Sequence, residues 1–190
     1  MSVGHDSGLH GRLVEVIASK GLLHLEEPVQ LASGAWSSDF VDVKAALGMG
    51  DDLALACDVL LERLQAEGVE FDAIGGLTMG ADQFAHGVAI RGGKAWFVVR
   101  KAPKGRGTNK RIEGATLAPA TRVVLVEDVA TTGGSLQEAM EVVRSEAACQ
   151  VVAAVAVVDR AESARRLFED AAVPYLALVT YRDLGIPLDR

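Results

Sequence analysis

Two adjacent acidic residues, Glu127 and Asp128, lie between an apolar run and a short segment rich in glycines and hydroxyl groups. The apolar run predicts a buried strand, and the glycines let backbone N–H groups turn inward around an anion. A helix predicted to begin near Ser135 adds unpaired N–H groups and the positive end of its dipole. No lysine follows the glycines, so the segment is not a Walker loop. The candidate phosphate-binding residues are Thr131, Thr132, Gly133, Gly134 and Ser135.

Carboxylates beside a phosphate cradle suit a ligand that carries both hydroxyl and phosphate groups, such as a sugar phosphate. Two acids next to a phosphate site would repel the ligand unless they had a specific role. Hydrogen bonds to two vicinal ribose hydroxyls would provide one, and stabilisation of positive charge on a ribose ring would provide another. The structural alternatives are a solvated strand end for the acids and an ordinary strand-to-helix turn for the glycines.

A basic segment contrasts with the acidic character of the whole chain, whose formal net charge is −7. Residues 84–111 contain no acidic residue but eight of the 19 lysines and arginines. The glycine-rich, like-charged stretch Arg100–Lys110 predicts a mobile loop, which could close over a phosphate-rich substrate. Its cations could neutralise charge that develops on a leaving group, although a solvated surface loop is the alternative. The candidate cations are Arg100, Lys101, Lys104 and Arg106.

The composition restricts the class of protein. With 190 residues, 49% of them hydrophobic, the chain is long enough for one domain with a buried core. The acidic net charge argues against a general nucleic-acid binder. The apolar run Val151–Val158 is far too short to span a bilayer, and the N-terminus lacks the features of a signal peptide, so we expect a cytoplasmic protein. Cys57 and Cys149 are isolated among apolar residues, which predicts buried positions instead of a disulfide or metal pair.

The elements that must position these groups alternate along the chain. Strands that are apolar on both faces and alternate with helices favour an α/β fold with a mainly parallel sheet. Before this pattern, Gly21–Val43 is predicted to be irregular or β-like. Helices are predicted at Leu9–Ser19, Asp51–Glu67, Ala81–Ala89, Ser135–Glu146 and Glu162–Ala172, and strands at Phe71–Ile74, Ala95–Val99, Arg122–Val126, Val151–Val158 and Tyr175–Val179.

Each loop of unusual composition follows the carboxyl end of a predicted strand, where parallel sheets bind their ligands. Thr78 lies in a loop whose backbone N–H groups could meet an anion at a helix start, with a tight turn as the alternative. Arg160 could pair with a carboxylate or a planar acceptor, with an ion pair at a helix start as the alternative. The loops are Gly75–Gly80, Arg100–Gly114, Glu127–Gly134 and Asp159–Arg160.

These motifs together resemble the type I phosphoribosyltransferases, and among them the orotate phosphoribosyltransferase family. The resemblance runs from about Leu31 to Arg160. The similar segments are the hood signature (Leu31–Gly34 with Phe40–Asp42), the pyrophosphate loop (Gly75–Ala81), the catalytic loop (Arg100–Gly114), the diphosphate-sugar motif (Val123–Ser135) and the strand end whose arginine meets orotate (Val157–Arg160).

The resemblance implies the type I phosphoribosyltransferase fold, an α/β fold in which helices flank a mainly parallel central sheet beneath a small N-terminal hood. The single domain would span residues 1–190, with the hood at about 10–45 and the core at about 50–180. The implied reaction converts orotate and 5-phosphoribosyl 1-diphosphate (PRPP) to orotidine 5′-monophosphate and pyrophosphate, with Mg²⁺, in pyrimidine biosynthesis. The resemblance also implies a homodimer whose basic loop reaches the neighbour's site, with neither nucleic acid nor membrane as a partner.

The resemblance also implies roles for the candidate residues. The turn after the acids would hold the 5′-phosphate, Glu127 and Asp128 would hold the ribose hydroxyls, and the basic loop would meet the departing pyrophosphate. Arg160 would orient orotate, with backbone near Ser33 and stacking by Phe40. We expect no metal ligand from the protein, because Mg²⁺ would be held mostly by substrate oxygens and water.

Three positions depart from the family's pattern. Ala32 and Met79 stand where lysine is frequent, and Arg106 stands where histidine is frequent. The departures leave two alternatives open, a phosphoribosyltransferase for another nucleobase and a non-catalytic regulator that binds PRPP. A generic sugar-phosphate enzyme is disfavoured by the paired acids.

Overall fold

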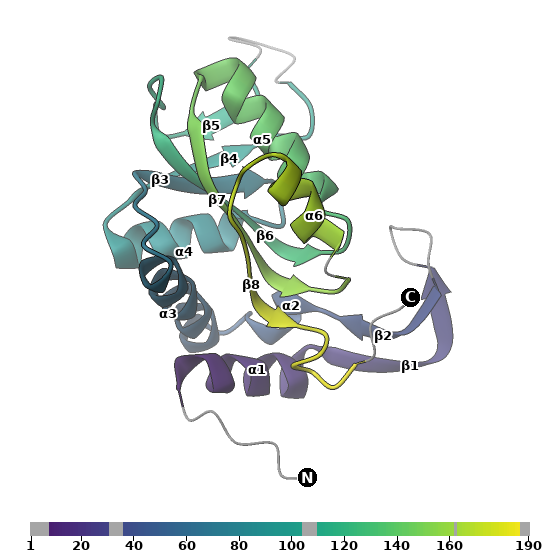
Figure 1. Cartoon of the computed structure of the whole chain (residues 1–190). Coiled ribbons are helices and arrows are strands. Elements are labelled where there is room, and N and C mark those ends of the chain that lie inside the picture. The colour runs from purple at the N-terminus through teal and green to yellow at the C-terminus, as the bar shows by residue number, and fades with distance from the viewer. Residues whose placement is uncertain (1–7, 31–35, 104–109, 162, 187–190) are drawn as a thin grey trace.

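The computed structural model describes residues 8–30, 36–103, 110–161 and 163–186 of the chain. Its main sheet has the strand order β5-β4-β3-β6-β7-β8 (Figure 1). All neighbouring strands in it are parallel except β5, which runs antiparallel to β4. The predicted α/β fold with a mainly parallel sheet is confirmed. The strands are β3 (Ala73–Leu77), β4 (Ala95–Val99), β5 (Ile112–Gly114), β6 (Arg122–Ala130), β7 (Gln150–Asp159) and β8 (Tyr175–Thr180).

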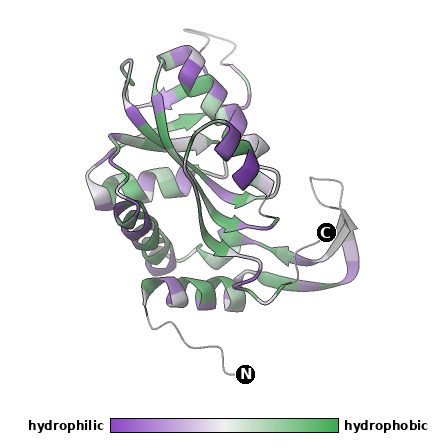
Figure 2. Ribbon diagram, in the orientation of Figure 1, coloured by the Kyte–Doolittle hydropathy of each residue, from purple (hydrophilic) through white to green (hydrophobic). Residues whose placement is uncertain are grey.

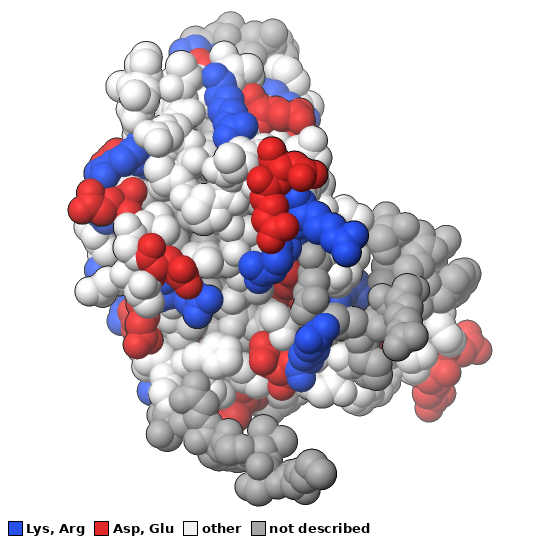
Figure 3. All heavy atoms as spheres, in the orientation of Figure 1, with Lys and Arg blue, Asp and Glu red and all other residues white. Residues whose placement is uncertain are grey.

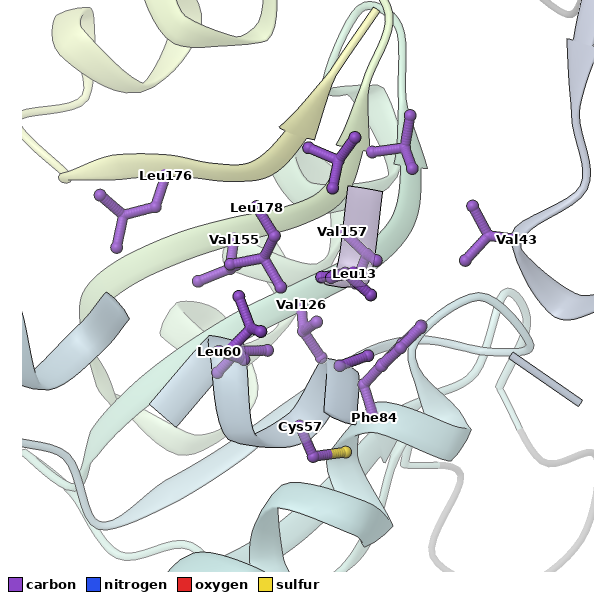
Figure 4. Close-up of a cluster of buried hydrophobic side chains, with 14 of the residues drawn as sticks. Leu13, Val43, Cys57, Leu60, Phe84, Val126, Val155, Val157, Leu176 and Leu178 are labelled. Carbon is purple, nitrogen blue, oxygen red and sulfur yellow. The ribbon is translucent and has the colours of Figure 1, made fainter. Parts of the chain in front are cut away.

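Helices cover both faces of this sheet, and its strands are largely hydrophobic (Figure 2). On one face lie α1 (Leu9–Lys20), α3 (Gly50–Ala66) and α4 (Asp82–Gly92), whose buried Leu13 and Leu60 share a cluster with Val126 of β6 (Figure 4). On the other face lie α5 (Gly134–Ala147) and α6 (Ser163–Asp170), which contribute Leu136 and Phe168 to a second cluster. Burial of the sheet on both faces explains why its strands are continuous apolar runs in the sequence.

The N-terminal part forms a separate two-stranded sheet beside the main body (Figure 1). It consists of β1 (Leu22–Gln30) and the antiparallel β2 (Trp36–Val41), where β-like structure was expected. The short helix α2 (Val43–Ala46) follows, and the side chain of Asp42 caps it by accepting the N–H of Ala45 at 2.9 Å. This helix was not predicted, because four residues are too few to show a helical period.

Each of the four predicted loops has a wrong boundary. The loop Arg100–Gly114 ends in the strand β5, which was not predicted, and Asp159 belongs to β7. Two further strands, β3 and β6, continue past their predicted ends. Gly75 and Gly76 lie inside β3, where a Cβ atom would come within 2.2 Å of the backbone oxygens of Phe97 and Val126. Glycine here allows neighbouring backbones to approach closely and is not a loop signal. The other strand is β6, whose pairing with β7 continues through Glu127 and beyond, so the paired acids belong to a strand end.

Both cysteines are buried and unbonded, which confirms their predicted place in the core. Cys57 lies on α3 against α4, where a Cβ atom on Gly87 would come within 2.5 Å of its Sγ atom. Among the described residues, no helix combines the length and apolar character that a membrane crossing requires.

Candidate active site

Two hollows open at the carboxyl ends of the parallel strands. One has a volume of about 470 Å³ and is lined by Glu127 and the residues of the following turn up to Ser135. The other has a volume of about 560 Å³ and lies between the loop after β3 and the start of the basic segment, where Thr78 and Lys101 are part of its lining. Three of the four unusual loops contribute to these hollows, and the fourth, Asp159–Arg160, lies at the same edge of the sheet beside Ala130.

Asp128 is the more fully engaged of the two acids. It is only 8% exposed, and its Oδ1 atom accepts the backbone N–H of Val129 at 2.8 Å. Its Oδ2 atom accepts a hydrogen bond from the Nζ atom of Lys44 on α2, in an ion pair. The sequence analysis missed Lys44, because the two partners are 84 positions apart and nothing in a four-residue helix signals the contact.

Glu127 has a strongly perturbed acidity. Burial, followed by the neighbouring charge of Asp128, raises its pKa from 4.5 to about 7. A hydrogen bond with the Ser135 side chain and the charges of Lys44 and Lys101 act in the opposite direction. The site thus places a carboxyl group that titrates near neutral pH beside one that an ammonium group holds.

The glycine turn after the acids is held in place by α6. Gly133 has a φ of +81°, and a Cβ atom there would lie 3.0 Å from the Cβ atom of Ala164. The hydroxyl of Ser163 donates a hydrogen bond to the backbone oxygen of Thr131 at 2.5 Å. The 14-residue helix α5 begins directly after the turn, so its first N–H groups are available to an anion. The geometry agrees with the predicted phosphate cradle.

The loop after β3 lies against the two acids. A Cβ atom on Gly80 would come within 2.8 Å of Asp128 Oδ1 and 2.9 Å of Glu127 Oε1. The hydroxyl of Thr78 donates to Asp82 at 2.7 Å, and the N–H of Thr78 donates to the backbone of Val99. Both donors of Thr78 are therefore hydrogen-bonded within the protein. An anion at this loop would have to bind other N–H groups.

The described cations of the basic segment differ in their surroundings. Arg100 donates from Nη1 to Glu113 at 3.0 Å, within the antiparallel β4–β5 pair that begins the segment. Lys101 is exposed, and its positive charge acts to lower the pKa of Glu127. Lys104 and Arg106 lie outside the described residues. Basic and acidic side chains are otherwise interspersed on the face shown in Figure 3, so a polyanion site would be local.

Arg160 directly follows β7 and lies over an aromatic ring. Its guanidinium carbon is 5.1 Å from the ring centroid of Tyr181, and its N–H donates to the backbone of Ala130 at 2.9 Å. The neighbouring Asp159 is 2% exposed and accepts the N–H of Ala161 at 3.2 Å. The ring of Tyr181, which follows the neighbouring strand β8, was not predicted from the sequence as a partner of Arg160.

Phe40 lies on β2 with 39% of its surface exposed, opposite Leu23 of β1. An exposed aromatic ring on the N-terminal sheet is compatible with the predicted stacking on a planar ligand. Ser33, expected to contribute backbone groups near this ring, lies outside the described residues.

No group of three or more His, Cys, Asp or Glu side chains within the described residues could hold a metal ion by itself. The oxygen donors at the site are the carboxylates of Glu127 and Asp128. Carboxylate oxygens suit Mg²⁺, but two of them fit a metal that arrives with a phosphate substrate better than one held in an all-protein cage.

Comparison with known proteins agrees with this geometry. The family model described as "Phosphoribosyl transferase domain" matches residues 48–173. The orotate phosphoribosyltransferase of Streptomyces coelicolor is 42% identical over 184 residues, which cover 94% of this chain and 98% of that protein. The chain belongs to the orotate phosphoribosyltransferase family. The predicted resemblance is confirmed.

Solved structures of orotate phosphoribosyltransferases share the fold. The Mycobacterium tuberculosis enzyme in complex with PRPP has a TM-score of 0.77 and 29% identity, with 94% of this chain and 100% of that chain covered. The Aeropyrum pernix enzyme has a TM-score of 0.78 and 32% identity, with 90% and 95% covered. The predicted type I phosphoribosyltransferase fold is therefore confirmed as well.

One of the departures from the orotate phosphoribosyltransferase pattern can be located in the structure. Met79, which stands where lysine is frequent, is 71% exposed and lines the hollow that also contains Lys101. A neutral side chain thus occupies a wall on which a cation would face a diphosphate. Ala32 and Arg106 lie outside the described residues.

Proposed function

We propose that the protein converts orotate and PRPP to orotidine 5′-monophosphate and pyrophosphate in pyrimidine biosynthesis. One observation carries the proposal: near the carboxyl end of β6, Glu127 lines the hollow of the glycine turn, and Asp128 is the next residue of the strand. The membership of the chain in the orotate phosphoribosyltransferase family supports the substrates.

The turn Thr131–Ser135 binds the 5′-phosphate of PRPP. Gly133 and Gly134 leave room for the anion, and the start of α5 supplies N–H groups and a favourable dipole, worth roughly 0.3–1 kcal/mol. The hydroxyls of Thr131 and Thr132 add donors, and Ser135 would join them by exchanging its hydrogen bond with Glu127 for one with the phosphate. Because these contacts are the same before and after the reaction, they contribute to binding more than to rate.

Glu127 and Asp128 accept hydrogen bonds from the ribose hydroxyls. The bond between C1 of the ribose and the diphosphate oxygen breaks with its electron pair on the diphosphate, and positive charge develops on the ring. The two carboxylates favour that charge electrostatically. N1 of orotate bonds to C1 as the diphosphate leaves, and the N1 proton passes to the departing pyrophosphate or to water, so no protein base is needed.

The cations at the start of the basic segment stabilise the departing pyrophosphate. Lys101 is placed near the acids, and Lys104, Arg100 and Arg106 are proposed to join it when substrate is bound. Arg100 would have to exchange Glu113 for the diphosphate. A single donor to developing charge is worth about 2.7–4 kcal/mol of the barrier, so these residues dominate the rate.

Mg²⁺ would be held mostly by substrate oxygens and water, and Glu127 and Asp128 are the residues that would add carboxylate oxygens. When bound, it would supply charge neutralisation for the diphosphate. The proposed Mg²⁺ dependence is supported by the oxygen-rich donor set described above.

Arg160, Phe40 and backbone near Ser33 are proposed to orient orotate. The orotate carboxylate suits a guanidinium group, and its ring suits an aromatic face. We also propose a single domain over residues 1–190, with a hood at about 10–45, and a homodimer that shares the basic loop. We propose the cytoplasm as its location, in line with the N-terminal sequence, which shows no basic and apolar signal-peptide regions.

A direct assay tests this function. The protein is mixed with orotate, PRPP and Mg²⁺, and the absorbance of orotate is followed, with adenine, hypoxanthine and uracil as competing bases in parallel. We expect orotate alone to be consumed, and only with PRPP present. Consumption of another base in its place would contradict the substrate, and PRPP binding without consumption of any base would indicate a regulator.

A further inference from the structure

We propose that Lys44 is a positioning residue of the phosphoribosyl site, which holds the Asp128 carboxylate in the orientation that receives the ribose. The inference rests on the proposed function, because it gives Lys44 a role in PRPP binding. It concerns a residue of the N-terminal part, far from the acids in sequence. The juxtaposition that carries it is the ion pair between Lys44 and Asp128.

The helix that carries Lys44 is firmly anchored. Val43 and Ala46 are 2% and 1% exposed and belong to the same hydrophobic cluster as the helices below the main sheet. Figure 4 shows Val43 at one side of that cluster. The cap from Asp42 to the N–H of Ala45 fixes the start of the turn. The base of the Lys44 side chain therefore has a defined place relative to β6.

Both oxygens of Asp128 are directed by protein donors. The N–H of Val129 holds Oδ1 at 2.8 Å, and the ammonium group of Lys44 holds Oδ2. Rotation of the carboxylate would break at least one of these contacts. Each carboxylate oxygen can accept a second hydrogen bond, so Asp128 remains able to receive a ribose hydroxyl while it is held.

Lys44 also reduces the charge that a polyanion meets. Glu127 and Asp128 are adjacent and mostly buried, and PRPP brings several further negative charges. The side chain of Lys44 is 52% exposed, and its ammonium group compensates the charge of Asp128. Loss of this cation would therefore weaken PRPP binding, whereas orotate, expected at the end of β7 near Arg160, would be affected much less.

The chain offers a closely matched control for this ion pair. Lys20 of α1 pairs with Asp52 of α3 at 2.5 Å, and these side chains are 47% and 13% exposed. The corresponding values for Lys44 and Asp128 are 52% and 12%. Both pairs join the N-terminal part to the body of the protein, but only one involves an acid of the site. Lys20→Met therefore reproduces the loss of such a pair without touching PRPP.

The experiment compares Lys44→Met, Lys44→Arg and Lys20→Met with the wild type. Calorimetry with Mg²⁺ and PRPP gives the dissociation constant for PRPP, and steady-state kinetics gives KM for each substrate. We expect Lys44→Met to weaken PRPP binding about tenfold, with KM for orotate changed less than about twofold. Lys44→Arg should restore most of the affinity, and Lys20→Met should leave both substrates unaffected.

A double-mutant cycle tests whether Lys44 acts through Asp128. In an Asp128→Asn background, the further change Lys44→Met should weaken PRPP binding by much less than it does in the wild type. Equal effects in the two backgrounds would overturn the positioning role, because Lys44 would then act on the ligand independently of Asp128. Thermal unfolding of every variant identifies any loss of affinity that comes from a loss of fold.

Other outcomes also overturn the inference. Unchanged PRPP affinity in Lys44→Met, an equal rise in both KM values, or the same effect in Lys20→Met would each contradict it. These results can be distinguished from failure of the proposed function, which the wild type alone decides. Wild-type protein that does not bind PRPP would overturn the function and the inference together, and wild-type binding with an ineffective Lys44→Met would overturn the inference alone.

Discussion

At the scale of single residues, the two adjacent acids have different environments and hence different properties. Lys44 and the Val129 backbone hold Asp128, whereas Glu127 carries a pKa of about 7 because of burial and its charged neighbour. The sequence predicted that the pair matters, because two acids at a strand end beside a glycine turn are chemically unusual. Their inequality was not predictable, since it comes from partners distant in sequence.

The raised pKa of Glu127 predicts a pH-dependent stability. The folded protein holds this proton more tightly than the unfolded chain, so the associated stability is fully present below pH 4.5 and is lost as the pH rises to about 7. Glu127→Gln removes this loss. Relative to the wild type, the variant should gain up to about 3 kcal/mol between pH 5 and pH 8, measured by chemical unfolding at both values. If Glu127→Gln and the wild type differed by the same free energy of unfolding at both pH values, the raised pKa of Glu127 would be contradicted.

Lys101 is predicted to act on the rate. Lys101→Ala should lower kcat by roughly 100-fold to 1,000-fold, because one donor to developing charge is lost, and should change KM for PRPP far less. Steady-state kinetics checks this, with Lys110→Ala as a control for charge in the same segment. An effect of Lys101→Ala that is confined to KM would refute the role of Lys101 at the departing pyrophosphate.

At the scale of elements, the alternation of apolar strands and helices was readable from the sequence because burial on both faces leaves a continuous apolar run. The predicted strand ends were wrong where a strand continued through glycines or acidic residues, which are typical of loops. These residues are Gly75 and Gly76 in β3 and the acids in β6. Close packing against Phe97 and pairing with β7 decide these boundaries. Neither interaction is visible in local sequence.

The contacts between α6 and the turn Thr131–Ser135 predict the effect of one added methyl group. Gly133→Ala combines a φ of +81° with a Cβ atom 3.0 Å from that of Ala164, so the turn must shift. We expect a destabilisation of roughly 1–3 kcal/mol and a clear rise in KM for PRPP. Thermal unfolding and steady-state kinetics measure both quantities.

Gly185→Ala separates backbone strain from displacement of the turn. Gly185 has a φ of +72° but no neighbour within 4 Å of an added Cβ atom, and it lies outside the site. This variant should lose a similar free energy of unfolding while its KM for PRPP remains that of the wild type. An equal rise in KM for PRPP in both variants would mean that backbone strain alone, and not the contact of the turn with α6, raises KM.

At the scale of the whole molecule, the site joins segments that are distant in sequence. From the N-terminal part, Lys44 contacts Asp128 at the edge of the main sheet, where the turn and Arg160 also lie. Phe40 of the same part is proposed to join them. The sequence predicted the members that share a motif, because each motif carries its own chemistry. Lys44, Ser163 and Tyr181 were missed because their roles depend on which helix or strand lies beside the motif after folding.

The proposed homodimer predicts complementation between two defective variants. The changes Lys104→Ala in the basic loop and Asp128→Asn at the strand end affect different parts of the site, so a mixed dimer with a shared loop contains one site with both changes and one intact site. After equal mixing and subunit exchange, half of the dimers are mixed, and about a quarter of the wild-type activity should return. Activity equal to the sum of the separate variants would exclude loop sharing.

Above all, we infer that the paired acids and the glycine turn bind one phosphoribosyl group. A crystal structure of the protein with PRPP and Mg²⁺ tests it most directly. We predict the 5′-phosphate on the backbone of Thr131–Ser135 and the ribose hydroxyls within hydrogen-bond distance of Glu127 and Asp128. A ribose bound elsewhere, with both carboxylates turned away from the ring, would contradict the account.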